Sequence, residues 1–288
     1  MSRQRSVGDA VTLARTLLFV PGDRPGRFAK AIASGADGIV LDLEDAVAVR
    51  AKDDARTHVT DWLTGRPAAV VRINAVGTPW FDADVAALRT VGGDPGVTVM
   101  LPKASVDGVA AVVSALGEQA RVLALVETAA GVMQAASICA LPQVIRLAFG
   151  SIDFSTEVGV DPDDREALLQ ARCGLVLASV AAGIAAPLDG VTTDLTSGAP
   201  AGADAGYASR LGFTGKLCIH PSQVDPVHAA LEPDPAQLDW ARSIIAGSAG
   251  GAARVDGHMV DAPVVERARR LLDRREIRAA STIHGSNQ

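Results

Sequence analysis

Residues Gly38 to Val47 read GIVLDLEDAV, an apolar run that ends in three acids, Asp42, Glu44 and Asp45. A continuous run of valine, leucine and isoleucine is typical of a parallel strand that is buried on both faces of a sheet. Carboxylates at the end of such a strand are costly unless a cation or another polar group pairs with them. This stretch therefore predicts a buried strand whose carboxyl end faces a charged site.

Seven further stretches resemble this strand, and helix-like segments lie between them. The predicted strands are Thr16–Val20, Gly38–Asp42, Ala69–Ile73, Val97–Leu101, Val122–Val126, Ile145–Phe149, Leu188–Val191 and Gly215–Ile219. The helix-like segments are Arg27–Ser34, Ala46–Leu63, Phe81–Val91, Val106–Leu116, Gly131–Cys139, Arg165–Gly183 and Ala203–Leu211. This alternation predicts an α/β fold, a TIM (β/α)8 barrel. A doubly wound sheet is the main alternative, and the polar carboxyl ends of most of the eight strands favour the barrel.

The pattern changes after the eighth predicted strand. Residues 226–235 are rich in proline, a helix is expected at Ala236–Ala246, and a last helix begins near Ala262. We therefore expect residues 1–225 to form the barrel, with a disordered N-terminal lead. We expect residues 226–288 to form a C-terminal helical extension that acts as a lid.

Charge and composition argue against several classes of protein. The 288 residues carry a net charge of −6 and contain no run of basic residues, which disfavours nucleic-acid binding. No apolar stretch approaches the roughly 20 residues that a membrane-spanning helix needs. The three cysteines lie far apart without CxxC spacing, which fits buried thiols in a reducing compartment. We expect a cytoplasmic protein that binds neither nucleic acid nor membrane.

Charged or titratable residues lie at the carboxyl ends of seven of the eight predicted strands. They are Asp23 and Arg24, with Lys30 in the following helix, then Asp42, Glu44, Arg72, Lys103, Glu127, Asp153 and His220. Each has a simpler structural explanation: acids favour helix N-termini, Arg72 or Lys103 can form a rim salt bridge, and His220 can cap a turn. Because the active sites of TIM barrels lie at this end of the strands, the whole set favours one functional site.

Two of these acids suit a magnesium ion. Glu127 and Asp153 follow the fifth and sixth strands, which are neighbours in a barrel, so their carboxylates can meet. Proteins commonly hold Mg²⁺ through one or two carboxylates, with waters and substrate oxygens completing an octahedron. A cation at this position would also explain acids at the ends of apolar strands.

Eight motifs occur along the chain in a recognisable order. They are FVPGDRPGRFAKA, GADGIVLDLEDAV, VVRIN, LPKA, ALVET, FGSIDF, GKLCIHPSQV and GHMVDAPVVERA. Together they resemble the HpcH/HpaI aldolase/citrate lyase family, in particular its citrate lyase beta-chain-like members, whose relatives include malyl-CoA and citramalyl-CoA lyases. The resemblance extends from about Thr16 to Leu272. It implies a Mg²⁺-dependent TIM barrel that acts on coenzyme A thioesters.

The resemblance also implies roles for the residues of the matching motifs. Glu127 and Asp153 would be the metal ligands, and Ile152 beside Asp153 departs from a common form of the family. Arg72 would bind the carboxylate or carbonyl oxygens of the acid portion of the substrate. The candidates for substrate and coenzyme A binding are Phe19, Arg24, Lys30, Arg72 and Glu127, together with the strand-end residues Lys103 and His220.

Acid–base chemistry is the least defined of these roles. Asp261 matches a family aspartate that reaches the site of a neighbouring subunit from a C-terminal lid, which implies a homotrimer or hexamer. It is the candidate general base. Asp42 and Glu44 would support catalysis by orienting Arg72 or metal-bound water.

The expected function is cleavage of a 3-hydroxyacyl-CoA thioester of the citryl-, malyl- or citramalyl-CoA type to an acyl-CoA and a 2-oxo acid. One alternative uses the same site for a malate-synthase-like condensation or for thioester hydrolysis. Another is a non-catalytic subunit that binds coenzyme A or acyl-carrier groups, in which case an acyl carrier protein would be a partner. The sequence leaves open the acyl group, the stereochemistry and the direction of the reaction.

Overall fold

The computed structural model describes residues 7–64, 69–91, 98–247, 253–255 and 258–272. The chain divides into two compact units, Met1–Leu231 and Glu232–Gln288. The boundary expected between residues 225 and 226 falls inside helix α11 (Val224–Leu231), which belongs to the first unit. Within the described ranges, no helix is both long enough and apolar enough to cross a membrane.

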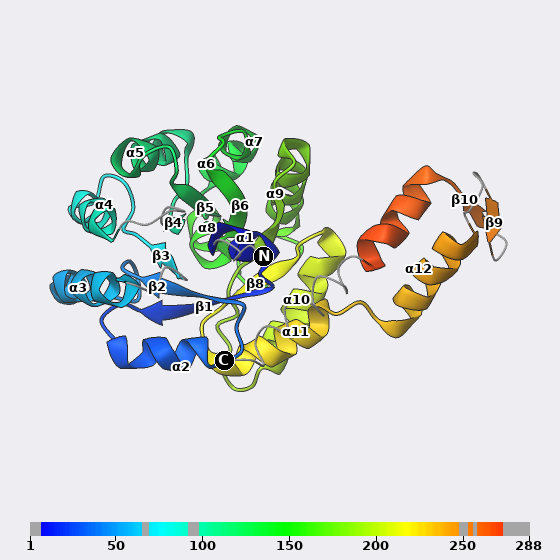
Figure 1. The fold of residues 1–288 in the computed structure, drawn as a ribbon, viewed down its shortest axis with the longest axis horizontal. Helices are drawn as coiled ribbons and strands as arrows, with labels where there is room; N and C mark the ends of the chain where they lie inside the picture. The colour runs from blue at the N-terminus through cyan, green and yellow to red at the C-terminus, as the bar shows by residue number, and fades with distance from the viewer. Residues whose placement is uncertain (1–6, 65–68, 92–97, 248–252, 256–257, 273–288) are drawn as a thin grey trace, which may run out of the picture. The chain divides into compact units, whose positions relative to one another are not determined.

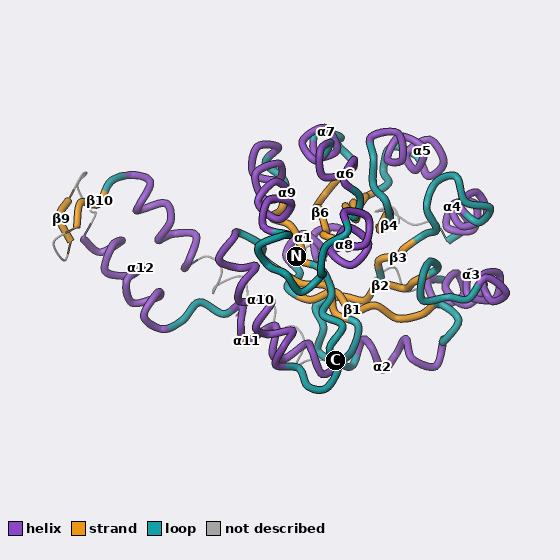
Figure 2. The backbone as a smooth tube through the Cα atoms, turned by 180° about the vertical axis from the view of Figure 1, so that it is seen from behind, coloured by secondary structure: helices purple, strands orange, loops and turns teal. Residues whose placement is uncertain are grey.

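The first unit contains a closed barrel of eight parallel strands (Figures 1 and 2). The strands are β1 (Thr16–Pro21), β2 (Gly38–Asp42), β3 (Val70–Arg72), β4 (Thr98–Leu101), β5 (Arg121–Val126), β6 (Val144–Phe149), β7 (Ala185–Asp189) and β8 (Gly215–Cys218). Each strand pairs with the next in the sequence, and β8 closes the ring on β1. This order confirms the TIM barrel and excludes a doubly wound sheet, whose strand order reverses at a switch point.

Helices surround the barrel. They are α1 (Val7–Leu13), α2 (Phe28–Ile32), α3 (Lys52–Leu63), α4 (Phe81–Thr90), α5 (Val106–Leu116), α6 (Ala129–Met133), α7 (Ala135–Cys139), α8 (Ser151–Val158), α9 (Leu169–Ala182) and α10 (Ala199–Leu211), with 3-10 turns η1 (Pro25–Arg27), η2 (Val49–Ala51) and η3 (Pro221–Gln223). The helix predicted from Ala46 begins only at Lys52. The reason is that the Asp42 carboxylate binds the amides of Glu44 and Ala46 and fixes a turn there.

The start of the described chain is helical, whereas a disordered lead was expected. Val7–Leu13 form α1, and residues 1–6 lie outside the described residues. Arg146 on β6 is fully buried, and its Nη1 donates to the carbonyl oxygens of Val11 and Ala14 at 2.7 and 2.6 Å. Both of these residues pack with the apolar cluster of the barrel interior. The expectation does not hold for residues 7–13, because the arginine that anchors them lies far along the sequence.

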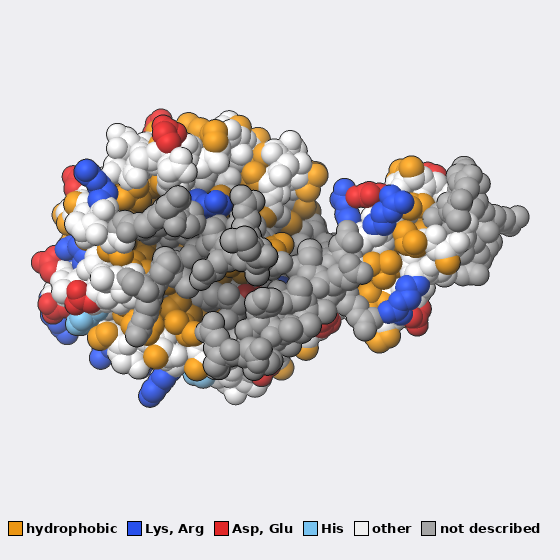
Figure 3. Space-filling view, viewed as in Figure 1, with side chains coloured by type: hydrophobic (Ala, Val, Ile, Leu, Met, Phe, Trp, Pro, Cys, Tyr) orange, Lys and Arg blue, Asp and Glu red, His pale blue; other side chains and the backbone are white. Residues whose placement is uncertain are grey.

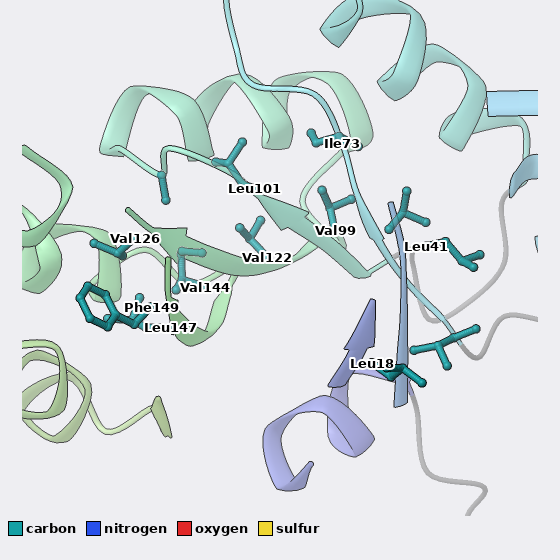
Figure 4. Close-up of a cluster of buried hydrophobic side chains, with 14 of the residues drawn as sticks. Leu18, Leu41, Ile73, Val99, Leu101, Val122, Val126, Val144, Leu147 and Phe149 are labelled. Carbon is teal, nitrogen blue, oxygen red and sulfur yellow. The ribbon is translucent and has the colours of Figure 1, made fainter. Parts of the chain in front are cut away.

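Alternation along the strands creates two apolar layers. Leu17 on β1 and Val40 on β2 belong to the cluster that fills the barrel interior. Leu18 belongs to the larger cluster between the strands and the helices, part of which Figure 4 shows. Because successive side chains of a strand point to opposite faces, the next inward positions on β1 and β2 are Phe19 and Asp42. The strand pattern thus places the Asp42 carboxylate and the Phe19 ring directly above an apolar interior.

The second unit has its own small core. It consists of α12 (Pro235–Gly247), a hairpin of β9 (Ala253–Val255) and β10 (His258–Val260), and a helix over residues 262–272. Ala241 and Ile244 pack with Val260 and Ala268 in a separate apolar cluster. Both helices expected after the barrel are present, and the action of this unit as a lid stays a prediction.

Candidate active site

Asp42 and Arg72 form a buried ion pair at the carboxyl ends of β2 and β3, where the two positions are in register. Nε and Nη2 of Arg72 donate to the two carboxylate oxygens of Asp42 at 2.7 and 2.6 Å. The amides of Glu44 and Ala46 donate to the same carboxylate at 2.8 and 3.1 Å. Burial opposes the guanidinium charge, but the attraction of Asp42 outweighs it and raises the pKa of Arg72. The first acid of GIVLDLEDAV is therefore fully compensated.

The remaining nitrogen of the Arg72 guanidinium faces the other acids of the same stretch. Nη1 lies 3.1 Å from Oε2 of Glu44 and 3.5 Å from Oδ2 of Asp45. The guanidinium carbon lies 4.7 Å from the centroid of the Phe19 ring, within cation–π range. Asp42 thus sets the orientation of Arg72, and Nη1 is directed to the acids Glu44 and Asp45.

Glu44 is buried and only partly compensated. The contact of its Oε2 with Nη1 of Arg72 is an ion pair without hydrogen-bond geometry, and this buried oxygen has no hydrogen-bond partner. Nζ of Lys103 lies 3.6 Å from Oε1. Burial raises the pKa of Glu44 to about 7, against the opposing charge of Arg72. Glu44 therefore changes its charge near neutral pH.

Glu127 follows β5 directly and lies close to Lys103. The amide of Lys103 donates to its Oε1 at 2.8 Å, and Nζ of Lys103 lies 3.7 Å from that oxygen. Lys103 has a φ of 47°, a left-handed conformation that is uncommon outside glycine, and this turn brings both nitrogens to Glu127. Burial raises the pKa of Glu127 to about 8, and the negative charges of Glu44 and Asp153 add to the shift.

Asp153 lies on a helix and not at a strand end. β6 ends at Phe149, Gly150 follows, and Asp153 is exposed in the first turn of α8. Asp153 thus follows the sixth strand as expected, and it lies in the first turn of α8 because the helix begins already at Ser151. Asp153 nevertheless lies within electrostatic reach of Glu127, since its charge contributes to the raised pKa of that residue.

Gly150 leaves the space that the Glu127 side chain occupies. A Cβ atom at position 150 would lie 2.3 Å from Cβ of Glu127 and 2.5 Å from its Oε2, closer than real Cβ atoms approach other groups. The missing side chain therefore allows the Glu127 carboxylate to lie beside the start of α8.

These donors fit a magnesium ion. Across the described part of the chain, no group of three or more His, Cys, Asp or Glu side chains could hold a metal. Mg²⁺ does not require one, since one or two carboxylates with water and substrate oxygens suffice. Burial, and to a smaller extent the negative charge of Glu44, raises the pKa of Glu127, and a divalent cation bound there would favour the ionised carboxylate. Glu127 and Asp153 remain the predicted ligands.

Three other predicted site residues of the first unit are exposed to solvent. Arg24 lies in the loop after β1 with its Nε 3.6 Å from Asp23, and Lys30 lies on α2. His220 caps η3, where its Nδ1 accepts a hydrogen bond from the amide of Ser222 at 3.2 Å. Capping a turn is the structural role that the sequence offered for His220 as an alternative to a role in the site. Roles of these residues in coenzyme A binding stay predictions.

Asp261 belongs to the second unit and is exposed at the start of the helix over residues 262–272. Its Oδ1 accepts a hydrogen bond from the amide of Val264 at 3.3 Å, the contact of an N-terminal cap. Its role as a general base is likewise a prediction.

Lys52, which the sequence pattern did not indicate, is buried beside the site. Its ammonium group donates to the carbonyl oxygens of Leu43 and Glu44 and to Oδ1 of Asn74, each at 2.7 Å. A lysine at the start of a helix has the signature of a solvated side chain. Lys52 is buried because the turn after β2 and the end of β3 lie against it in the folded protein.

The polar residues of β7 and β8 serve the barrel wall. Nε of Arg172 on α9 donates to Oδ1 of Asp189 at 2.9 Å, and Nζ of Lys216 lies 3.8 Å from Oδ2. Leu188 and Leu217, their neighbours along the strands, belong to the interior cluster. Since adjacent side chains alternate, Asp189 and Lys216 face the surrounding helices and not the barrel mouth.

Comparison with known proteins identifies the family. A family model described as HpcH/HpaI aldolase/citrate lyase matches residues 15–221. The chain belongs to the HpcH/HpaI aldolase/citrate lyase family. This membership confirms the resemblance seen in the ordered motifs, and with it the lyase class and the barrel fold expected from them.

Individual members of the family align along nearly their whole length. A citrate lyase subunit beta-like protein of Mycobacterium tuberculosis (strain H37Rv) is 39% identical over 265 residues, which is 89% of this chain and 94% of the relative. A (3S)-malyl-CoA thioesterase of Cereibacter sphaeroides is 32% identical over 276 residues, 92% of this chain and 96% of the relative. The crystal structure of CitE from Mycobacterium tuberculosis in complex with magnesium, acetoacetate and coenzyme A has a TM-score of 0.80 at 37% identity, and covers 91% of this chain and 97% of that chain.

Replacement of Gly150 tests the space reserved for Glu127. We expect Gly150→Ala to displace the Glu127 carboxylate and to weaken Mg²⁺ binding about 10–100-fold, measured by titration calorimetry. Gly174→Ala on α9 is the matched control, because a Cβ there would meet no atom within 4 Å. An unchanged Mg²⁺ affinity in folded Gly150→Ala would contradict the assignment.

The pKa of Glu44 predicts a pH dependence of stability. Its value is about 7 in the folded protein against 4.5 for the free side chain, so the folded state holds a proton that the unfolded state has released. Stability therefore falls as pH rises from about 4.5 to about 7. We expect the melting temperature of Glu44→Gln to fall less over this range than that of the wild type. The exposed control Glu166→Gln should follow the wild type, and parallel curves for all three proteins would refute the raised pKa.

Proposed function

We propose that this chain is a Mg²⁺-dependent carbon–carbon lyase that cleaves a 3-hydroxyacyl-CoA thioester of the citryl-, malyl- or citramalyl-CoA type to an acyl-CoA and a 2-oxo acid. The observation that carries this proposal is the buried Arg72–Asp42 pair with Glu127 close to the same acids at the barrel mouth. The structure of CitE, which is 37% identical, contains magnesium, acetoacetate and coenzyme A. A metal ion, an oxo acid and a coenzyme A group are the components that this reaction requires.

Arg72 would bind the acid portion of the substrate. Asp42 accepts from Nε and from one N–H of Nη2, and Nη1 lies against Glu44 and Asp45, so a substrate carboxylate or carbonyl oxygen would meet the guanidinium N–H groups that Asp42 does not use. A fixed guanidinium in a buried position stabilises negative charge that develops on these oxygens as the carbon–carbon bond breaks. Phe19 covers the guanidinium and limits the approach of water to it.

Glu127 and Asp153 would hold the metal. When bound, Mg²⁺ supplies a Lewis acid that lowers the pKa of the substrate hydroxyl. The amide of Lys103 orients Glu127, and Gly150 gives its carboxylate room beside α8. Asp153, which is exposed in the first turn of α8, can reach a cation that arrives from solvent.

Asp261 would remove the hydroxyl proton in a neighbouring subunit. Exposed apolar side chains on the first unit support self-association: Met133, Leu177 and Val180 are 84%, 70% and 66% exposed. Figure 3 shows such side chains in orange over α9. A homotrimer or hexamer with shared sites follows from the family resemblance and is consistent with this surface.

Thioester hydrolysis is the second candidate, because a (3S)-malyl-CoA thioesterase is 32% identical over 276 residues. In hydrolysis, water attacks the thioester carbonyl carbon and free coenzyme A departs. The same arginine and the same carboxylates would bind the substrate in both reactions. The two activities therefore differ in their products and not in their recognition groups.

The products distinguish these functions. With Mg²⁺ and malyl-, citramalyl- or citryl-CoA, we expect acetyl-CoA and a 2-oxo acid, detected by liquid chromatography. EDTA should stop the reaction, and Glu127→Ala should lower its rate at least about 10²-fold because the metal loses its buried ligand. The exposed Glu118→Ala variant is the control. Free coenzyme A without acetyl-CoA would show a thioesterase, and no turnover with intact coenzyme A binding would show a non-catalytic subunit.

Mixing of inactive variants tests shared sites. Arg72→Ala and Asp261→Ala chains should each be inactive, and their mixture should recover activity, because one subunit supplies the barrel and another supplies Asp261. Arg72→Ala mixed with Glu127→Ala should stay inactive, since every barrel then carries a defect. Absence of recovery after subunit exchange, verified by native mass spectrometry, would refute a base acting between subunits.

A further inference from the structure

Lys52 is a buried cation that binds uncharged acceptors. Its side chain lies at the start of α3, almost fully buried, and its three N–H groups meet three oxygens at 2.7 Å. The nitrogen also lies 5.2 Å from the centroid of the Trp80 ring. An ammonium group has three donors, so this arrangement satisfies all of them. Burial of a charged group is costly. A buried ammonium group with all three donors satisfied therefore indicates a structural role for Lys52.

The two carbonyl oxygens belong to the turn that carries the site acids. Lys52 binds the carbonyl groups of Leu43 and Glu44, while Asp42 binds the amides of Glu44 and Ala46. Polar groups therefore hold this turn from both sides. The position of the Glu44 side chain, which contacts Arg72 and Lys103, follows from that of the turn.

Asn74, the third acceptor of the Lys52 ammonium group, is itself held by hydrogen bonds. Nδ2 of Asn74 donates to the carbonyl oxygen of Leu43 at 2.9 Å and to Oδ2 of Asp84 at 2.6 Å. Nε of Arg56, one turn further along α3, donates to Oδ1 of Asp84 at 2.9 Å. The turn, α3, the end of β3 and α4 are thereby joined through one set of buried hydrogen bonds.

We propose that Lys52 is a positioning residue for the Arg72 site: it fixes the turn Leu43–Ala46 so that the Glu44 carboxylate stays against Nη1 of Arg72 and Nζ of Lys103. Lys52 acts through this turn and does not touch the substrate. The kinetic consequence of this assignment rests on the proposed lyase function. The structural consequence, a turn that loosens when the ammonium is removed, is independent of any reaction.

Lys52→Met removes the ammonium and keeps the length of the side chain. We expect amide hydrogen exchange of the turn to rise at least about tenfold, measured by mass spectrometry on peptides that cover Leu43–Ala46. Val59→Ala is the matched control, because Val59 is a fully buried apolar residue of the same helix. If Lys52→Met does not fold, Lys52→Gln replaces it with the same expected direction. Equal exchange in wild type and Lys52 variant would overturn the proposal.

Kinetic coupling to Glu44 separates positioning from general stability. We expect Lys52→Met to lower kcat/KM about 10–100-fold in the wild type and less than about twofold in a Glu44→Gln background. Val59→Ala should leave kcat/KM within about twofold. The same loss in both backgrounds, or the same loss in Val59→Ala, would overturn the proposal. If the wild type shows no turnover on the thioester panel, the lyase function fails while the exchange experiment still decides the role of Lys52 in the turn.

Discussion

The ion pair between Asp42 and Arg72 organises the barrel mouth. Two opposite charges removed from water cost more than their attraction returns unless the geometry is good and the remaining hydrogen-bonding groups are satisfied. Both conditions hold here, because the guanidinium binds both carboxylate oxygens and two backbone amides complete the shell of the acid. The pair in turn fixes where the next acids of the chain can lie. The site is therefore built outward from two strand ends that are in register.

Negative charge exceeds positive charge around this pair. Glu44 and Glu127 are both buried, and the pKa of each carboxyl is raised to about 7 and about 8. Lys103 contacts both acids but is half exposed, so it compensates them only in part. Such raised values in a cluster are typical of sites that bind a cation or transfer protons. A metal ion that binds there would offset the free-energy cost of burying these two carboxylates.

The site does not use the barrel rim evenly. Strands β1, β2, β3 and β5 supply Phe19, Asp42, Arg72 and Glu127, while β7 and β8 direct Asp189 and Lys216 to the surrounding helices. The ends of β1, β2, β3 and β5 thus carry most of the groups proposed to bind substrate and metal. Strands β7 and β8 contribute to the barrel wall, with His220 as the cap of the turn after β8.

The barrel and the polar strand ends were predictable from short-range patterns, and the family from motifs in a fixed order along the chain. Continuous apolar runs, helix formers between them and acids at strand ends are local signals that can be seen in the sequence. It also identified Asp42, Arg72, Lys103 and Glu127, which the fold brings together. Only the folded structure shows that Lys52 and Arg146 are buried, that Val11 and Ala14 pack against the barrel interior, and that Asp153 lies in the first turn of α8. The physical reason is that burial of a charged side chain depends on the approach of groups distant in the sequence, which no local pattern records.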